Sequence, residues 1–108
     1  MGLDKDAGID VPKWDVALAS LIRDASISKG GSLTIEDFSR IAREHSIRFD
    51  DIMETVFALC INGQWRYTDA NGVVHQITQD EVNRLYVERR LYEKDLREYT
   101  GNWSPLHG

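Results

Sequence analysis

The chain has 108 residues, 42% of them hydrophobic and 29% charged, which is typical of one small globular domain and excludes a disordered chain. It has 13 lysines and arginines against 18 aspartates and glutamates, so its formal net charge is -5. That charge excludes a generally basic surface of the kind that binds nucleic acid through phosphate contacts alone, but it leaves room for a local basic patch.

The first predicted elements in chain order are an arm and a helix. Residues 1–11 are polar and contain glycine, which predicts a flexible N-terminal arm. A helix is predicted from Pro12 to Ala25, because proline suits a first helical turn and apolar residues then recur at three- and four-residue steps. Residues 26–32 include Gly30 and Gly31 and are predicted to end this helix.

A second helix is predicted to begin at Thr34 and to end near His45. The hydroxyl of Thr34 suits an N-cap, and acidic residues follow it in the first turn, where they complement the helix dipole. Leu33 and Phe38 have the spacing of a hydrophobic staple across this helix start.

A third helix is predicted from Asp51 to Asn62. Asp51 and Glu54 have the spacing of a capping pair, and the helix is the most apolar of the chain. Gly63 follows as a natural C-terminal stop.

Residues 64–69 and 73–78 flank the loop 70–72 and predict a β-hairpin. A three-residue loop with its glycine in the left-handed conformation is a common hairpin connection, and it places Tyr67 opposite His75. A two-residue turn would scatter the apolar side chains over both faces, so we favour the three-residue loop.

A final long helix is predicted from Gln79 to Thr100, with Thr78 as its N-cap, Gly101 as its stop and a tail over residues 102–108. Apolar and aromatic residues from Val82 to Tyr99 mark one face of this helix, and Val87 and Leu91 lie off that stripe. At 1.5 Å per residue this helix is about 33 Å long, more than a small three-helix core can cover. Its distal half therefore projects into solvent, packs on a second chain to form a homodimer through residues 79–100, or folds back onto the hairpin. The division is thus an arm, a body over residues 12–78 and a C-terminal helix and tail over residues 79–108.

The order of three helices followed by a hairpin resembles the winged helix-turn-helix architecture over residues 12–78. The predicted fold class is therefore mainly α with a small β-hairpin, a winged-helix-like body and a long C-terminal helix. In that resemblance the third helix is the recognition helix and the loop 70–72 is the tip of the wing. The resemblance implies a DNA-binding transcriptional regulator as one possible function, with dimerisation through the C-terminal helix.

The charges at the start of the third helix argue against reading DNA. Asp50, Asp51 and Glu54 occupy the positions that a recognition helix turns toward the groove, where they would meet the negative charge of the phosphates. A protein partner is therefore favoured over a nucleic acid, and an acidic imitation of nucleic acid ranks below both. If DNA is bound, the predicted contacts are Arg40, Arg43, Arg48 and Arg66.

No motif in the sequence predicts catalysis or a cofactor. Cys60 with His45 or His75 has the residue types of a nucleophile–base pair, but the apolar surroundings of the cysteine favour a buried structural thiol. The three histidines of the chain are isolated and lack the spacing of metal ligands. We predict no enzymatic activity, no metal and no cofactor.

Compartment predictions rest on what the sequence lacks. A single cysteine excludes an internal disulfide, and the N-terminus lacks the pattern of a signal peptide. The longest apolar run, residues 57–61, is far shorter than the roughly 20 residues that span a bilayer. We expect a cytoplasmic protein without a membrane span.

Aromatic and apolar residues of the hairpin and of the C-terminal third are the predicted partner-binding positions, because aromatic side chains are enriched at interface hot spots. These residues are Trp65, Tyr67, Tyr92, Leu96, Tyr99 and Trp103. The leading functional prediction is therefore a small non-enzymatic protein–protein interaction module, an adaptor or regulatory subunit.

Overall fold

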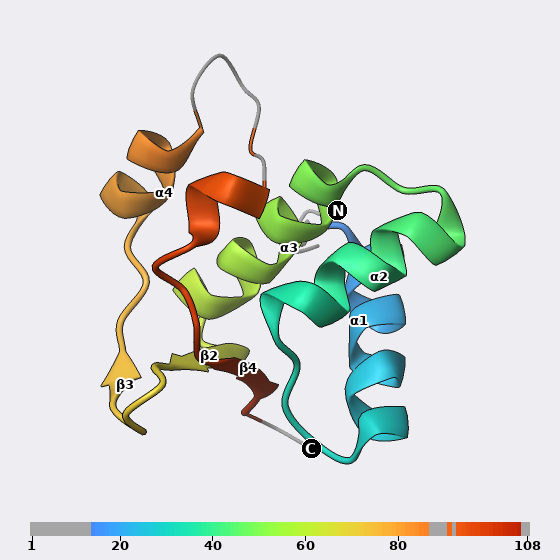
Figure 1. Cartoon of the computed structure of the whole chain (residues 1–108), viewed down its shortest axis with the longest axis horizontal. Coiled ribbons are helices and arrows are strands. Elements are labelled where there is room, and N and C mark those ends of the chain that lie inside the picture. The colour runs from blue at the N-terminus through green and yellow to red at the C-terminus, as the bar shows by residue number, and fades with distance from the viewer. Residues whose placement is uncertain (1–13, 87–90, 92, 107–108) are drawn as a thin grey trace, which may run out of the picture.

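A computed structural model of the protein describes residues 14–86, 91 and 93–106 (Figure 1). These residues form four α-helices, one short 3-10 helix and a three-stranded antiparallel sheet, which confirms a mainly helical fold with a small sheet. In chain order the elements are α1 (Val16–Lys29), α2 (Ile35–His45), α3 (Phe49–Ile61), β2 (Trp65–Thr68), β3 (Val74–His75), α4 (Gln79–Leu85), η1 (Glu93–Leu96) and β4 (Asn102–Pro105). The predicted arm over residues 1–11 and a helix start at Pro12 lie outside the described residues.

Helix α1 is set by caps at both ends. Asp15 is the N-cap, and its carboxylate accepts the backbone N–H of Leu18 at 3.0 Å. The helix continues past the predicted end at Ala25 to Lys29. It ends only at Gly30, whose φ of 99° is a left-handed conformation that glycine adopts without steric cost.

Helix α2 begins and ends where the sequence predicts. The hydroxyl of Thr34 accepts the N–H of Asp37 at 3.3 Å, and the carboxylate of Asp37 accepts the N–H of Thr34 at 2.8 Å, which completes a capping box. Lys29 at the end of α1 and Arg40 one turn along α2 also donate to this buried carboxylate. Burial raises the pKa of Asp37, but these hydrogen bonds outweigh burial and lower the pKa to about 2.

The depressed pKa of Asp37 predicts a pH-dependent contribution to stability. The Asp37→Asn variant is expected to lose about 2 kcal/mol of unfolding free energy at pH 7, because the ionised carboxylate is favoured in the folded chain. The loss should be full above the ordinary value of 3.8 and should vanish as the pH falls through about 2. Urea unfolding at pH 7 and pH 2 measures it, with the exposed Asp24→Asn as control. Equal losses at both pH values would contradict this assignment.

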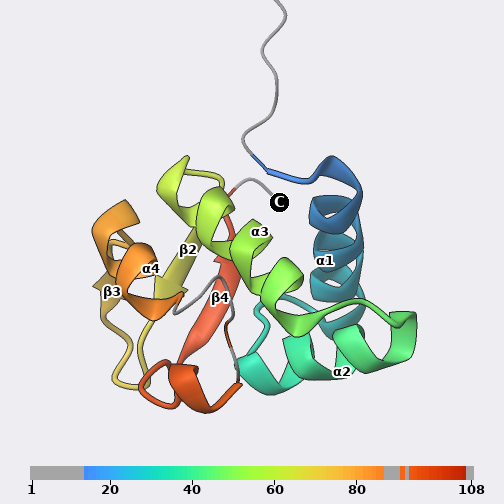
Figure 2. The ribbon, with the colours of Figure 1, turned by 90° about the horizontal axis from the view of Figure 1, so that it is seen from above.

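Helix α3 is the central helix and lies between α1 and α4 (Figure 2). It begins at Phe49, before the predicted start, and no side chain caps it, so the predicted capping pair of Asp51 and Glu54 is wrong. Instead Arg48, at the N-cap position, forms a bidentate ion pair with Asp50, in which Nε lies 2.9 Å from Oδ1 and Nη2 lies 2.6 Å from Oδ2. Most of the remaining side chains of α3 are buried against α1, α2 and the sheet, which leaves one narrow exposed stripe.

The hairpin has the predicted register. Tyr67 lies opposite His75, and the loop glycine Gly72 has a φ of 84° in the left-handed region. The Asp69 carboxylate stabilises the turn by accepting the backbone N–H of Val73 at 2.9 Å. The hairpin strand β3 is only two residues long, so β2 relies on its other neighbour for most of its pairing.

The prediction of one helix from Gln79 to Thr100 is wrong. Thr78 caps α4 as predicted, but α4 ends at Leu85, and the chain then returns through η1 to form β4. The physical reason is burial, because a continuous helix would leave Leu91 and Leu96 in water, whereas they are 2% and 1% exposed here. The chain does fold back onto the hairpin, but as the strand β4 and not as the long helix that was predicted.

Strand β4 completes the sheet from the far end of the sequence. It pairs antiparallel with β2, where Trp103 lies opposite Tyr67, and on its other side Trp103 forms an isolated bridge with Leu33. The sheet order is β3-β2-β4. The sheet therefore joins the hairpin to the segment between α1 and α2.

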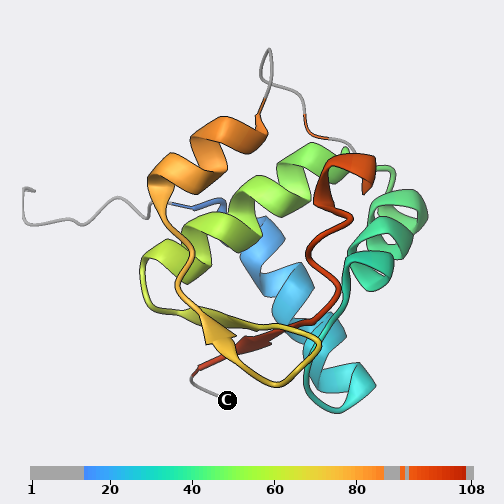
Figure 3. The ribbon, with the colours of Figure 1, turned by 60° about the vertical axis from the view of Figure 1, so that its left-hand side comes forward.

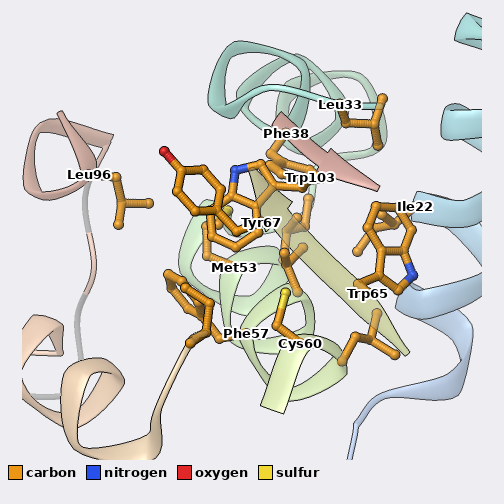
Figure 4. Close-up of a cluster of buried hydrophobic side chains, with 14 of the residues drawn as sticks. Ile22, Leu33, Phe38, Met53, Phe57, Cys60, Trp65, Tyr67, Leu96 and Trp103 are labelled. Atoms are coloured by element: carbon orange, nitrogen blue, oxygen red, sulfur yellow. The ribbon is translucent and has the colours of Figure 1, made fainter. Parts of the chain in front are cut away.

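Trp103 is the centre of the hydrophobic core (Figure 4). Its side chain is fully buried, and its ring lies 4.6 Å from Tyr67, 5.4 Å from Phe57, 6.0 Å from Tyr99 and 6.3 Å from Phe38 between centroids. These rings come from four different parts of the chain, so one side chain holds α2, α3 and the sheet together.

Candidate functional site

The exposed stripe of α3 is the candidate site, and we call Asp51, Glu54 and Ala58 the α3 face. Asp51 and Glu54 are exposed and Ala58 is partly exposed. Their spacing of three and four residues places them on one side of the helix. The prediction of an acidic outer flank is confirmed for these two carboxylates and is wrong for Asp50, which is 5% exposed and paired with Arg48.

A groove of about 640 Å³ runs between α3 and α4, which lie side by side (Figure 3). At one end Tyr86 donates its hydroxyl proton to the backbone carbonyl of Asp50 at 3.0 Å, which fixes the end of α4 to the start of α3. At the other end the groove is lined by Ile61 and Gln79, so the two helices run antiparallel. The groove is charged beside the start of α3, and toward Ile61 it is lined by apolar side chains of α3 and by the uncharged amides of Gln79 and Asn83.

Tyr86 is held as a neutral hydroxyl in this groove. Burial raises its pKa well above the ordinary value, and the nearby carboxylates of Glu54, Asp50 and Asp51 raise it further. The phenol therefore stays protonated and serves as a hydrogen-bond donor that anchors the groove. A protonated phenol that already donates to the backbone carbonyl of Asp50 does not act as a base.

A second groove, of about 550 Å³, lies on the other side of the α3 face against the start of α1. Trp14 and Leu18 supply its apolar wall, and Asp15 adds a third carboxylate. Both grooves share all three residues of the α3 face. The face is therefore a negatively charged ridge with a partly apolar hollow on each side.

The charge of the ridge is not balanced within the described residues. Neither Asp51 nor Glu54 forms an ion pair with a cation that the structure describes. Arg48, the lining cation of the larger groove, is paired with Asp50. The surface potential of the α3 face is therefore negative, which attracts cationic groups and repels phosphates.

The walls that α1 and α4 contribute to these grooves were not predicted from the sequence. The spacing of Val82 and Tyr86, four residues apart, indicates one face of a short helix, but the predicted long helix assigned that face to the body or to a dimer. Trp14 and Leu18 belong to the apolar stripe of the first helix, and nothing in the sequence separates an edge of that stripe from its centre.

The predicted partner-binding residues lie mostly inside the protein. Trp65, Tyr67, Leu96 and Trp103 are at most 4% exposed, and they form the core rather than a surface. Tyr99 is partly buried and donates its hydroxyl proton to Glu81. Tyr92 lies outside the described residues.

The four predicted nucleic-acid contacts do not form one basic surface of unpaired cations. Arg40 is 3.0 Å from the carboxylate of Asp37, and Arg48 pairs with its own carboxylate partner as described above. Arg43 on α2 and Arg66 on β2 are exposed. Two of the four positive charges are therefore already engaged within the protein.

A third hollow, of about 450 Å³, lies where the hairpin, α4 and the segment after η1 meet. It contains an exposed pair in which a ring nitrogen of His75 lies 2.6 Å from the carboxylate of Asp69. The hydrogen bonds from the turn N–H of Val73 and from His75 lower the pKa of Asp69. The lining residues of this hollow include no serine, threonine or cysteine that the pair could activate.

Cys60 is a buried thiol, as predicted, and burial raises its pKa to about 12. In the native protein at pH 8 we expect its reaction with a disulfide reagent to be about 100-fold or more slower than in urea, because almost none of it is thiolate and little of it is accessible. Absorbance of the released thiolate measures both rates. Equal rates would contradict the buried assignment.

Among the described residues, no group of three or more acidic, histidine or cysteine side chains is placed to hold a metal ion. Among the same residues, no helix has the length and apolar character to cross a membrane. Comparison with models of protein families, with curated proteins and with solved structures finds no match to this chain.

Proposed function

We propose that this protein is a small non-enzymatic interaction module that binds a polypeptide partner through the α3 face. The observation that carries the proposal is the pairing of exposed, unneutralised carboxylates at Asp51 and Glu54 with two partly apolar grooves. A hollow that combines apolar walls with a few charged groups is typical of a recognition surface. An adaptor or regulatory subunit is the role that suits such a surface.

The arrangement of elements supports a winged-helix-like body. The helices α1, α2 and α3 precede the hairpin of β2 and β3, and α3 is at the place of the recognition helix. What this helix exposes is the α3 face, and a duplex would bring its phosphates against Asp51 and Glu54. The body therefore supports recognition of a protein in place of DNA.

The DNA-binding regulator remains the rival prediction. It expects salt-dependent binding of duplex DNA that is lost on Arg40→Ala, Arg43→Ala or Arg48→Ala. The ion pairs of Arg40 and Arg48 with carboxylates do not favour it.

A homodimer through residues 79–100 also remains a prediction. Its motivation was an exposed apolar helix, and the burial of Leu91 and Leu96 removes that motivation. The mass of the protein in solution decides the question.

The proposal is tested by selecting peptides from a random 16-residue display library against the full chain. Enriched peptides should shift the backbone amide resonances of residues 51–58, and Glu54→Lys should weaken their binding about tenfold or more. The matched control is Asp24→Lys, which makes the same change of charge on the exposed side of α1 and should leave affinity within about twofold.

Two results would overturn the proposal. One is a selection in which no enriched peptide perturbs the α3 face. The other is specific binding of a duplex by the unmodified chain together with peptide binding that Glu54→Lys leaves unchanged.

A further inference from the structure

Resting on the proposed function, we infer that the groove between α3 and α4 binds one amphipathic basic helix of a partner protein in a defined orientation. The lysine or arginine of that helix lies against Asp51 and Glu54, and its apolar side chain lies against Ala58 and Ile61. The two anchors of the partner are seven residues apart on one helix face.

The polarity of the groove supports this orientation. Its lining changes along α3 from the carboxylates of Asp51 and Glu54 to Ala58 and the partly exposed Ile61. From α4, Val82 adds to the apolar lining, and the exposed amides of Gln79 and Asn83 form an uncharged polar edge. A partner that is basic throughout would leave this apolar end unmatched, and a wholly apolar partner would leave the two carboxylates unpaired.

The spacing of the anchors follows from helix geometry. Glu54 and Ile61 are two turns apart on α3, which separates them by about 10 Å along the helix axis. A partner helix lying along the same groove covers that distance with residues i and i+7, which also share a face. An extended peptide would cover it in about three residues, whose side chains alternate between two sides.

The groove is held open before a partner arrives. The hydroxyl of Tyr86 is bonded to the backbone of Asp50, and that residue is itself fixed by Arg48. Val82, one turn before Tyr86, is 7% exposed and anchors the middle of α4 to the body. A groove between two fixed helices suits the helix-in-groove mode of recognition, in which binding needs little rearrangement of the host.

The test uses peptides enriched by the selection described above, synthesised singly. Their far-ultraviolet circular dichroism should become helical on binding, and a lysine or arginine should stand seven residues from a large apolar residue. Exchanging the basic residue for glutamate should weaken binding to the unmodified chain about tenfold and should restore binding to Glu54→Lys.

The apolar end has its own variants. Ile61→Asp should weaken binding about tenfold, whereas Ile27→Asp, a matched change at an exposed position of α1, should not. Ala58→Arg fills the groove without removing a buried side chain and should also weaken binding. Its matched control is Ala17→Arg, at an exposed position of α1.

The outcomes separate this inference from the proposed function. Peptides that perturb the α3 face but bind without helix formation, lack the seven-residue spacing or ignore Ile61→Asp and Ala58→Arg overturn the inference and leave the proposed function standing. Failure to obtain any peptide that perturbs the α3 face overturns both.

Discussion

Replacing Trp103 by alanine is expected to lower the free energy of unfolding by about 4 kcal/mol, a large part of the stability of a domain this size. The side chain is fully buried and contacts rings of α2, α3 and β2, so its removal leaves a cavity that no single element can close. Urea unfolding followed by far-ultraviolet circular dichroism measures the loss without depending on the tryptophan that is removed.

Trp103→Phe is the informative companion. The indole nitrogen of Trp103 has no hydrogen-bond partner among the described residues, so losing its N–H breaks no bond there. The phenylalanine variant should therefore retain about half or more of the stability that alanine loses. Val74→Ala, at a position 54% exposed, should change stability by less than about 0.5 kcal/mol. A loss from Trp103→Ala no larger than that of Val74→Ala would show that β4 is not part of the core.

Gly101→Ala is expected to destabilise the protein by about 3 kcal/mol. A Cβ atom at residue 101 would lie 1.9 Å from the carbonyl oxygen of Thr68 and 2.6 Å from Cα of Asp69, so the backbone of β4 would have to move away from β2. The move would also strain the hydrogen bond from the N–H of Gly101 to the hydroxyl of Tyr67 at 3.0 Å. Thermal and urea unfolding of the variant measure the effect.

Gly72→Ala separates this steric clash from ordinary backbone strain. Gly72 has a positive φ of 84° but open space around its Cα, so alanine there should cost only about 1 kcal/mol. Equal losses for the two variants would mean that close contact with β2 does not explain the glycine at 101. The sequence suggests a helix stop for Gly101, and the structure replaces that reason with close packing of two backbones.

The parts of the fold that were predictable are those determined by neighbours in sequence. The N-caps at Thr34 and Thr78 and the hairpin turn at Gly72 depend on a few adjacent residues, and all three are confirmed. Helix α1 shows the limit of such local signals, because Ser26 continues the helix where a break was predicted.

The C-terminal third was not predictable in the same way. Its charged and apolar residues recur at helical intervals, yet burial of Leu91, Leu96 and Trp103 in one core favours a chain that turns back. The preference for a chain that turns back depends on the space that α2, α3 and β2 leave in the core. That space is a tertiary property, and the spacing of residues along the sequence does not indicate it. Val87 and Leu91, which lie off the predicted helical stripe, were the available signal, and of these only Leu91 is described.

In the candidate site, too, the features set by neighbours in sequence were predictable and those set by particular side-chain contacts were not. The outward placement of Asp51 and Glu54 follows from the amphipathic pattern of α3 and was predicted. The burial of Asp50 was not, because it depends on Arg48 turning back to pair with it. An arginine two positions from a carboxylate is compatible with an exposed carboxylate and also with a closed ion pair. The sequence alone does not distinguish the two.

The bridge between Leu33 and Trp103 has a consequence for biosynthesis. Strand β4 pairs with β2 and contacts the segment before α2, but it is synthesised after both of them. The helices and the hairpin therefore leave the ribosome before the sheet can close. Until then Phe38 and Phe57 lack the ring that joins them. We expect the nascent chain to pass through a loosely collapsed helical state with exposed aromatic surface, which is the kind of intermediate that chaperones bind.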